Sequence, residues 1–193
     1  MRELSLHILD IVENSIEAGA TRVEILVNED SRANRLTIVV EDNGRGMDAE
    51  TLKRVGDPFF TTRKTRHVGL GIPLFKAAAQ RCAGDLIVSS EPGKGTKVVA
   101  EFQRDHIDRA PLGDIKSTLL GLILSCEQCD IRYEQRLDGR AFVLDTRELR
   151  DILGQVPLSH PQVRDWLEEY IEEGLAELRQ APSATQEQNS SDF

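Results

Sequence analysis

Four short motifs follow one another within the first hundred residues, and they constrain this chain more than any other feature does. They are Asp10-Ile-Val-Glu-Asn14, Glu41-Asp-Asn-Gly-Arg-Gly46, Asp57-Pro-Phe-Phe-Thr-Thr62 with Gly69-Leu-Gly71, and Gly93-Lys-Gly-Thr96. Each motif alone is a weak signal, because Asp-Asn-Gly is also a common turn and Gly-x-Gly a common loop. In this order, with periodic helices and strands between them, they predict a pocket for a nucleotide and its metal ion.

The hydrophobic periodicity predicts an α/β layer over residues 1–104. Apolar residues at helical spacing predict a helix from Leu4 to Ala18, ended by Gly19. Capping signals predict further helices over residues 48–55 and 73–82, the last closed by Gly84. Strands are expected at residues 23–27, 36–41, 86–90 and 97–102, with a polar loop over residues 28–34. The expected architecture has helices on one face of a largely antiparallel sheet.

The second half of the chain predicts a smaller C-terminal α/β domain over residues 105–180, for regulation or for partners. Its expected elements are a helix at 112–126, a hairpin at 131–145 that turns at Asp138-Gly139, and helices at 146–153 and 163–178. Residues 181–193 are rich in Ser, Gln and Asn, a composition typical of a disordered tail.

Charge and composition exclude several classes of protein. The net charge of −9 argues against a nucleic-acid surface as the main function. No apolar run is long enough to span a bilayer, so a membrane segment is not expected. Three cysteines do not make a disulfide framework, which favours a reducing, cytoplasmic setting.

The order and wording of the four motifs resemble the GHKL superfamily of ATP-binding domains, which includes gyrase, the heat-shock chaperone ATPases, the histidine kinases and the mismatch-repair ATPases. The resemblance covers residues 1–104 and implies the Bergerat fold, a two-layer α/β sandwich. Phe59-Phe-Thr-Thr-Arg-Lys64 is closest to the histidine-kinase branch. Val12-Glu-Asn-Ser-Ile-Glu-Ala-Gly-Ala-Thr21 is closest to the mismatch-repair branch, so the chain does not sort cleanly into either.

Asp42 is the candidate for base recognition. A buried carboxylate can accept a hydrogen bond from an exocyclic amine, and the resemblance implies that this amine is N6 of adenine. Gly44 and Gly46 would let the backbone approach the base, and Met47 would pack beneath it. The resemblance also implies that Thr96 joins a network of Asp42, water and adenine. The alternative is that Asp-Asn-Gly is a plain turn.

Asn14 is the candidate ligand for Mg²⁺, because a triphosphate-bound magnesium ion needs only one or two protein oxygens. Asp10 lies one helical turn earlier on the same face. The resemblance implies that a carboxylate at this spacing activates the attacking water as a general base. The mismatch-repair and chaperone members carry Glu at this position. Asp is one methylene shorter, which predicts either slow hydrolysis or a base that acts through a water molecule. Glu13 is the second choice, since it points about 100° away around the helix axis.

The segment from Phe60 to Ile72 is the candidate phosphate site. Gly69-Leu-Gly-Ile72 should expose backbone N–H groups at the start of a helix, where the helix dipole favours anions. Residues 61–68 bring hydroxyls and cations toward the triphosphate, and the resemblance makes this segment a short mobile lid. The complete set of expected ATP contacts is Asn14, Ala18, Asp42, Gly44, Gly46, Met47, Phe60, Thr61, Thr62, Arg63, Lys64, Val68, Gly69, Leu70, Gly71, Ile72 and Thr96.

Three functions remain open on the sequence. The chain could hydrolyse ATP to drive a conformational or partner-binding switch, pass the γ-phosphoryl group to a partner protein as histidine kinases and anti-sigma-factor kinases do, or bind ATP as a regulatory module with negligible turnover. Only nine residues precede Asp10, so the phosphoacceptor hairpin of a histidine kinase is not expected. His7 lies on the same helix as Asn14 and is not expected to reach the γ-phosphate.

Weaker signals concern partners. Cys126-Glu-Gln-Cys129 has metal-site spacing, but without a second pair or a nearby His it is interpreted as a helix terminus. The apolar stripe of the last helix should pack on its own domain, with contact to a homodimer mate or another partner as the alternative. The whole chain, including Pro157-Leu-Ser-His-Pro161, is similar to small ATP-binding proteins encoded beside bacterial iron-only hydrogenases, a likeness that identifies no partner chemistry.

Overall fold

The computed structural model describes residues 3–55 and 70–180, and residues 1–2, 56–69 and 181–193 lie outside the described part. These two stretches contain both helices and strands. The helices are α1 (Leu4–Glu17), α2 (Ala49–Arg54), α3 (Gly71–Arg81), α4 (Ile115–Ser125), α5 (Thr146–Leu153) and α6 (Pro161–Arg179). The strands are β1 (Arg22–Asp30), β2 (Arg35–Asp42), β3 (Leu86–Glu91), β4 (Gly95–Gln103), β5 (Asp130–Leu137) and β6 (Arg140–Asp145).

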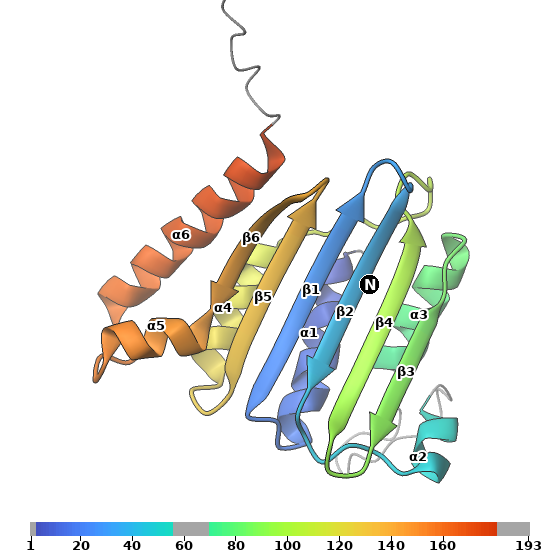
Figure 1. Cartoon of the computed structure of the whole chain (residues 1–193), viewed down its shortest axis with the longest axis horizontal. Helices are drawn as coiled ribbons and strands as arrows, with labels where there is room; N and C mark the ends of the chain where they lie inside the picture. Colours follow the sequence, from blue (N-terminus) through green and yellow to red (C-terminus); the bar gives the residue numbers. More distant parts are fainter. Residues whose placement is uncertain (1–2, 56–69, 181–193) are drawn as a thin grey trace, which may run out of the picture.

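The described strands form one six-stranded sheet in the order β3-β4-β2-β1-β5-β6. Every neighbouring pair is antiparallel except β1 and β5, which are parallel. Helices α1, α3 and α4 lie behind the sheet in Figure 1, and α6 runs beside β6 at one edge. The expected α/β layer, with helices on one face of a largely antiparallel sheet, is confirmed.

Burial alternates along the strands, as a sheet with one covered face requires. Every second residue of the central strands is buried against the helices, while its neighbours face the uncovered side. The inward set is Val23, Ile25, Val27, Leu36, Ile38, Val40, Val98, Ala100 and Phe102. These side chains belong to one core cluster with the buried faces of the helices.

Helix α1 supplies the helical side of that core. Leu4, Ile8, Ile11, Val12 and Ser15 repeat at three- and four-residue spacing, and all five are buried. Fully burying one of these isoleucines stabilises the fold by about 1.5–3 kcal/mol. The helix ends at Glu17, where Gly19 adopts a φ of 78° and turns the chain into β1. The positions of this helix and of its stop agree with the sequence prediction.

The second half of the chain continues the sheet of the first half. β5 pairs with β1 in parallel, and α4 is the crossover helix that such a pairing needs. The predicted hairpin is confirmed: Asp138 and Gly139 both have positive φ, as a two-residue turn between β5 and β6 requires. A separate C-terminal domain that begins at residue 105 stays a prediction. One sheet contains strands from both sides of this position, so the sheet itself marks no domain boundary there.

Several element boundaries differ from the sequence prediction. β1 continues to Asp30 and shortens the expected loop, because Asn28 to Asp30 pair with β2 across a tight turn. Helix α3 begins at Gly71, two residues before Pro73. After α3 the positive φ falls on Ala83, whereas Gly84 is needed because a Cβ there would lie 1.8 Å from the carbonyl oxygen of Glu101.

None of the described helices combines the length and the apolar character that a membrane span needs.

Candidate nucleotide-binding site

Residues from all four motifs meet at one end of the sheet. Asp42 ends β2 and lies opposite Thr96 at the beginning of β4. The last turns of α1 approach the same place, because Ser15 contacts Asp42 and Ala18 contacts the loop after β2. Helix α3 begins nearby, since a Cβ on Gly71 would lie 3.5 Å from the Cβ of Asp10. Segments distant in sequence therefore form one site.

Asp42 is buried, and its carboxylate is held by three hydrogen bonds. Its Oδ1 accepts from the backbone N–H of Gly44 at 2.8 Å and from that of Thr96 at 3.2 Å. Its Oδ2 accepts from the hydroxyl of Ser15 at 2.7 Å. A carboxylate offers about four lone-pair directions, so Oδ2 keeps one for a further donor. The group is thus oriented before any ligand binds.

Ser15 was not singled out from the sequence. It lies on the buried face of α1. Its hydroxyl has one proton, which lies between the Oδ2 of Asp42 at 2.7 Å and the carbonyl oxygen of Ile11 at 3.1 Å, and the shorter distance favours Asp42. One feature of the sequence could have indicated its role. Ser15 directly follows Asn14 and occupies the core face of the helix, where an apolar residue would otherwise be expected. A buried hydroxyl needs a partner, and here the partner is Asp42.

Two glycines let the loop after β2 pack against the β3–β4 hairpin. A Cβ on Gly46 would lie 2.0 Å from the carbonyl oxygen of Glu91, and one on Gly95 would lie 1.8 Å from that of Asp42. Both residues also have positive φ. A side chain is therefore disfavoured at each position by the close backbone contact and by the backbone conformation. The sequence interpretation gave Gly46 the role of approaching the base. The structure gives a different reason for glycine at this position, because its missing side chain faces β3.

Thr96 and Met47 meet at Ser90, on the neighbouring strand β3. The Ser90 hydroxyl lies 2.8 Å from the carbonyl oxygen of Gly95 and 3.0 Å from the Thr96 hydroxyl. Met47 donates its backbone N–H to the same oxygen of Ser90 at 2.8 Å. If the single proton of Ser90 is directed to Gly95, Thr96 donates to Ser90 and keeps lone pairs free to accept. This group of hydrogen-bonded residues lies beside Asp42, where the sequence analysis places the adenine base.

Asp10 and Asn14 lie on one face of α1, opposite the first residue of α3. A Cβ on Gly71 would be 3.7 Å from the Asn14 Nδ2 and 3.7 Å from the Asp10 Oδ2. Leu70 precedes α3 without a side-chain cap, and no acidic residue occupies the first turn. The first N–H groups of a helix have no partner within the helix, which suits an anion. The polar pair of α1 and this helix end therefore face one another.

His7 lies one turn before Asp10 and is buried. Its ring stacks on Phe75 of α3, with centroids 4.8 Å apart and an interplanar angle of 10°. Burial lowers the pKa of His7 to about 4, so the ring is neutral near pH 7. The expectation that His7 does not receive a phosphoryl group agrees with this packing between α1 and α3.

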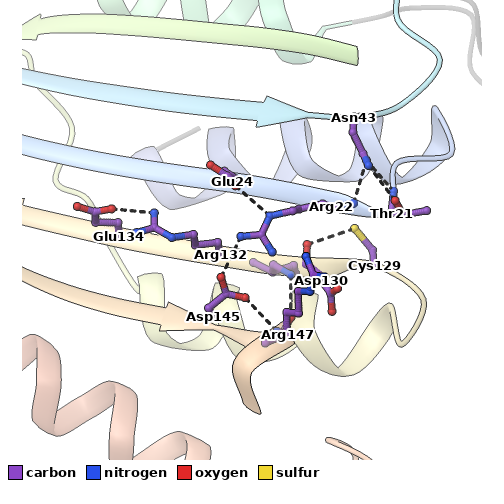
Figure 2. A network of polar contacts seen from close by, with 12 residues as sticks. Thr21, Arg22, Glu24, Asn43, Cys129, Asp130, Arg132, Glu134, Asp145 and Arg147 are labelled. Carbon is purple, nitrogen blue, oxygen red and sulfur yellow. Dashed lines mark hydrogen bonds and ion pairs between the residues drawn. The ribbon is translucent and has the colours of Figure 1, made fainter. Parts of the chain in front are cut away.

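Asn43 follows Asp42 and ties the site to the beginning of β1. Its Oδ1 accepts the backbone N–H groups of Thr21 and Arg22, both at 2.9 Å, and its Nδ2 donates to the Thr21 hydroxyl at 2.8 Å. Arg22 in turn donates to Asp145, which caps α5 (Figure 2). The motif that ends β2 is therefore connected by hydrogen bonds to the second half of the chain.

The two cysteines with metal-site spacing do not form such a site in the described structure. Cys129 is buried, and burial raises the pKa of its thiol to about 11, which disfavours the thiolate that binds metals or reacts. Cys126 is half-buried beyond the end of α4. Within residues 3–55 and 70–180, no group of three metal-binding His, Cys, Asp or Glu side chains occurs. The interpretation as a helix terminus agrees with this placement.

Several expected ATP contacts lie outside the described residues, and so does the proposed lid at 61–68. They are Phe60, Thr61, Thr62, Arg63, Lys64, Val68 and Gly69.

The fold and the clustered motifs define a nucleotide-binding domain of the α/β sandwich type. A family model described as histidine kinase-, DNA gyrase B- and HSP90-like ATPase matches residues 2–106. The chain belongs to this family of ATPase domains. Membership in the family supports ATP binding and confirms the GHKL resemblance of the motifs.

Curated proteins that are similar to the chain include several kinases. The chain is 46% identical over 109 residues to sensor protein kinase FleS of Pseudomonas aeruginosa, which covers 56% of this chain and 26% of that protein. It is 34% identical over 99 residues to sporulation kinase C of Bacillus subtilis, covering 50% and 23%. The chain therefore spans about a quarter of the length of these relatives, and the match concerns the ATPase domain.

A solved structure described as the N-terminal domain of a DNA repair protein has the same fold. It superposes with a TM-score of 0.54 at 14% sequence identity, over 75% of this chain and 53% of that one. The structural match covers more of the chain than residues 2–106 do, so part of the second half also follows that fold.

Proposed function

We propose that this protein binds Mg-ATP between α1, the end of β2, the beginning of β4 and the beginning of α3. In this proposal it hydrolyses ATP slowly and uses the nucleotide to drive a conformational or partner-binding switch. The observation that carries the proposal is the Asp42 carboxylate, which is buried, oriented by three hydrogen bonds and left with one acceptor direction.

Base selection would follow from that acceptor direction. Adenine presents an exocyclic amine that donates to Oδ2 of Asp42, whereas guanine presents a carbonyl oxygen at the same position. Two acceptors facing one another in a buried site cost about 1–3 kcal/mol, which is roughly one to two decades in affinity. Thr96 would bind the base through water, and Ala18, Gly44 and Met47 would line the pocket around the ring.

Asn14 would hold the magnesium ion through its amide oxygen, and Asp10 would orient and deprotonate the attacking water. Both side chains lie against Gly71, so a triphosphate placed at the beginning of α3 is within reach of both. The backbone N–H groups of Leu70, Gly71 and Ile72 would bind its phosphate oxygens. The contribution of residues 60–69 to this cradle stays a prediction.

A second candidate is a protein kinase that transfers the γ-phosphoryl group to a partner. The observation in its favour is that several similar curated proteins are kinases. In this reaction the bond between the β–γ bridging oxygen and the γ-phosphorus breaks, a partner side chain forms the new bond, and ADP leaves. The acceptor would be a residue of another protein, since His7 is packed against Phe75. An ATP-binding module with negligible turnover is the third reading.

One experiment separates these functions. The purified protein is incubated with γ-labelled ATP and Mg²⁺, with and without host lysate, beside the Asp42→Asn variant. Free phosphate formed without lysate, and lost in the variant, supports the ATPase. A labelled lysate protein that depends on Asp42 supports the kinase, and binding without release or transfer supports the module. If the parent protein and the variant bind ATP with equal affinity in calorimetry, the proposed site is wrong.

A further inference from the structure

Exposed apolar side chains gather far from the nucleotide site, where α5, α6 and β6 meet. They are the aromatic pair Trp166 and Tyr170 of α6, Val143 of β6 and Val156 of the turn between the helices, each between 38% and 45% exposed. A single exposed apolar residue needs no explanation, but a contiguous group often marks a binding surface. We name these four residues the α5–α6 patch.

A pocket of about 470 Å³ opens within this patch, between the end of α5 and the beginning of α6. It is lined by Leu153, Val156, Pro157, His160, Val163 and Trp166, among others. Most of these side chains are apolar, so the pocket would take an apolar group from a partner. Helix α6 begins at Pro161, and its first turns, with Val163 and Trp166, form one wall of the pocket.

The aromatic residues of the patch pack on one another and on the core. Trp166 stacks on Tyr170 with ring centroids 5.1 Å apart, Tyr170 contacts Phe142 at 5.6 Å, and Phe142 contacts the fully buried Tyr133 at 6.4 Å. The Tyr170 hydroxyl donates to the carbonyl oxygen of Val143 at 3.4 Å. Aromatic side chains fixed in this way lose little entropy on binding, which is typical of the anchors of protein interfaces.

The charges around the patch are mainly negative. Asp165, Glu169 and Glu173 lie exposed beside the aromatic ridge of α6, and Asp151 precedes Ile152 on α5. Among the described residues no ion pair joins any of these four carboxylates to a cation, whereas Glu168 and Glu172 on the next face both bind Lys116. The unpaired acidic rim therefore favours cations of a partner.

We infer that the α5–α6 patch binds an amphipathic segment of a partner protein, whose apolar side chains enter the pocket and whose lysines or arginines meet the acidic rim of α6. A helix with an apolar stripe between basic residues has both features. Arginine would gain further from stacking on Trp166 or Tyr170.

Other occupants fit less well. A second copy of the chain would bring a second acidic α6 against the first, and like charges repel across an interface. Residues 181–193 contain two carboxylates, no Lys or Arg, and one large apolar residue, Phe193. An anionic lipid surface is repelled by the same carboxylates.

The test uses the full chain and a synthetic amphipathic helix with a leucine stripe and lysines at its other positions. Trp166 is the single tryptophan of the protein, so its emission reports directly on the patch. We expect the lysine peptide to bind one to one and to shift the emission to shorter wavelength. A matched peptide with glutamates in place of the lysines should bind at least about tenfold more weakly.

Charge reversals on one helix locate the binding site. Glu169→Lys should weaken binding of the lysine peptide about three- to tenfold. Glu177→Lys is the matched control, because it makes the same change about 12 Å further along α6, beyond the screening length at physiological salt. It should leave the affinity within about twofold, since local contacts are unchanged.

Two truncations test the apolar contact by calorimetry, with the thermal unfolding midpoint as the control for folding. Trp166→Ala and Val156→Ser, both at exposed positions, should each weaken binding about tenfold or more. Equal binding of the two peptides, equal effects of Glu169→Lys and Glu177→Lys, or binding without a change in Trp166 emission would each overturn the inference. So would a dimer in sedimentation that Trp166→Ala dissociates, because a second copy would then occupy the patch.

Discussion

Replacing Asp42 by Asn should separate nucleotide binding from folding. The amide oxygen of the introduced side chain can still accept from Gly44 and Thr96, which hold Oδ1 at 2.8 and 3.2 Å in the parent protein. The amide NH₂ replaces Oδ2, and Ser15 can turn to accept from it where it now donates at 2.7 Å. The fold therefore loses little, since a hydroxyl can act in either direction.

The nucleotide meets a different situation in this variant. The adenine amine would face an NH₂ group, so two donors oppose one another where a donor and an acceptor met before. Losing one buried hydrogen bond and leaving an unsatisfied donor costs about 1–3 kcal/mol, a decrease in ATP affinity of roughly one to two decades. The selectivity for ATP over GTP should decrease as well, because the amide donor now suits a carbonyl oxygen.

Titration calorimetry with ATP and GTP measures both effects, and circular dichroism with thermal unfolding measures the fold. Asp151→Asn is the matched control, since it makes the same change at an exposed position on α5. Ser15→Ala is a useful companion, because it removes one support of Oδ2 and keeps the acceptor, so its loss of affinity should be smaller. Unchanged ATP affinity in Asp42→Asn would show that this carboxylate does not bind the base.

Three further outcomes are expected. Asn14→Ala should lose the dependence of ATP affinity on Mg²⁺, measured by calorimetry with and without the metal; a retained magnesium effect would place the ion elsewhere. Asp10→Asn should keep ATP binding but lower the rate of phosphate release about 10²–10⁴-fold, whereas Glu13→Gln should change it little; the reverse result would exchange their roles. The folded-state pKa of His7 is about 4 against 6.5 in the unfolded chain, so the unfolded state binds the extra proton between these values and stability decreases as the pH falls through this window. The decrease should approach about 3 kcal/mol, and His7→Leu should remove that part of the pH dependence of unfolding; an unchanged profile would refute the assignment.

Local structure was largely predictable because local chemistry determines it. Asp48 accepts a hydrogen bond from the Thr51 N–H and begins α2, as a capping residue should. Asp138-Gly139 adopts the positive φ values of a tight hairpin. In each case the residue that gives the sequence signal lies within three residues of the backbone groups whose conformation it determines. Boundaries were less predictable: α4 begins at Ile115 after the Asp114 cap, three residues later than apolar periodicity indicated.

Contacts between distant segments could not be read from the chain in this way. Pairing of β5 with β1 in parallel joins residues more than a hundred positions apart, and nothing in either strand specifies its neighbour. Ser15 has the same limitation, because its role depends on Asp42, which is 27 residues away. The Arg22–Asp145 ion pair is a third example. Spacing within a helix or strand predicts which face a residue occupies, but the partner on that face is decided by the sheet order.

The motif at the end of β2 left two interpretations, a plain Asp-Asn-Gly turn and a base-binding carboxylate, and the structure shows how one residue can serve both. The Oδ1 of Asp42 accepts from the N–H of Gly44 two residues later, which is the hydrogen bond of an Asx turn. Its Oδ2 is held from the opposite side by Ser15. A turn that consumes one oxygen fixes the rotation of the carboxylate and thereby aims the other. The turn propensity of this sequence is thus the local cause of the orientation on which the proposed adenine contact depends.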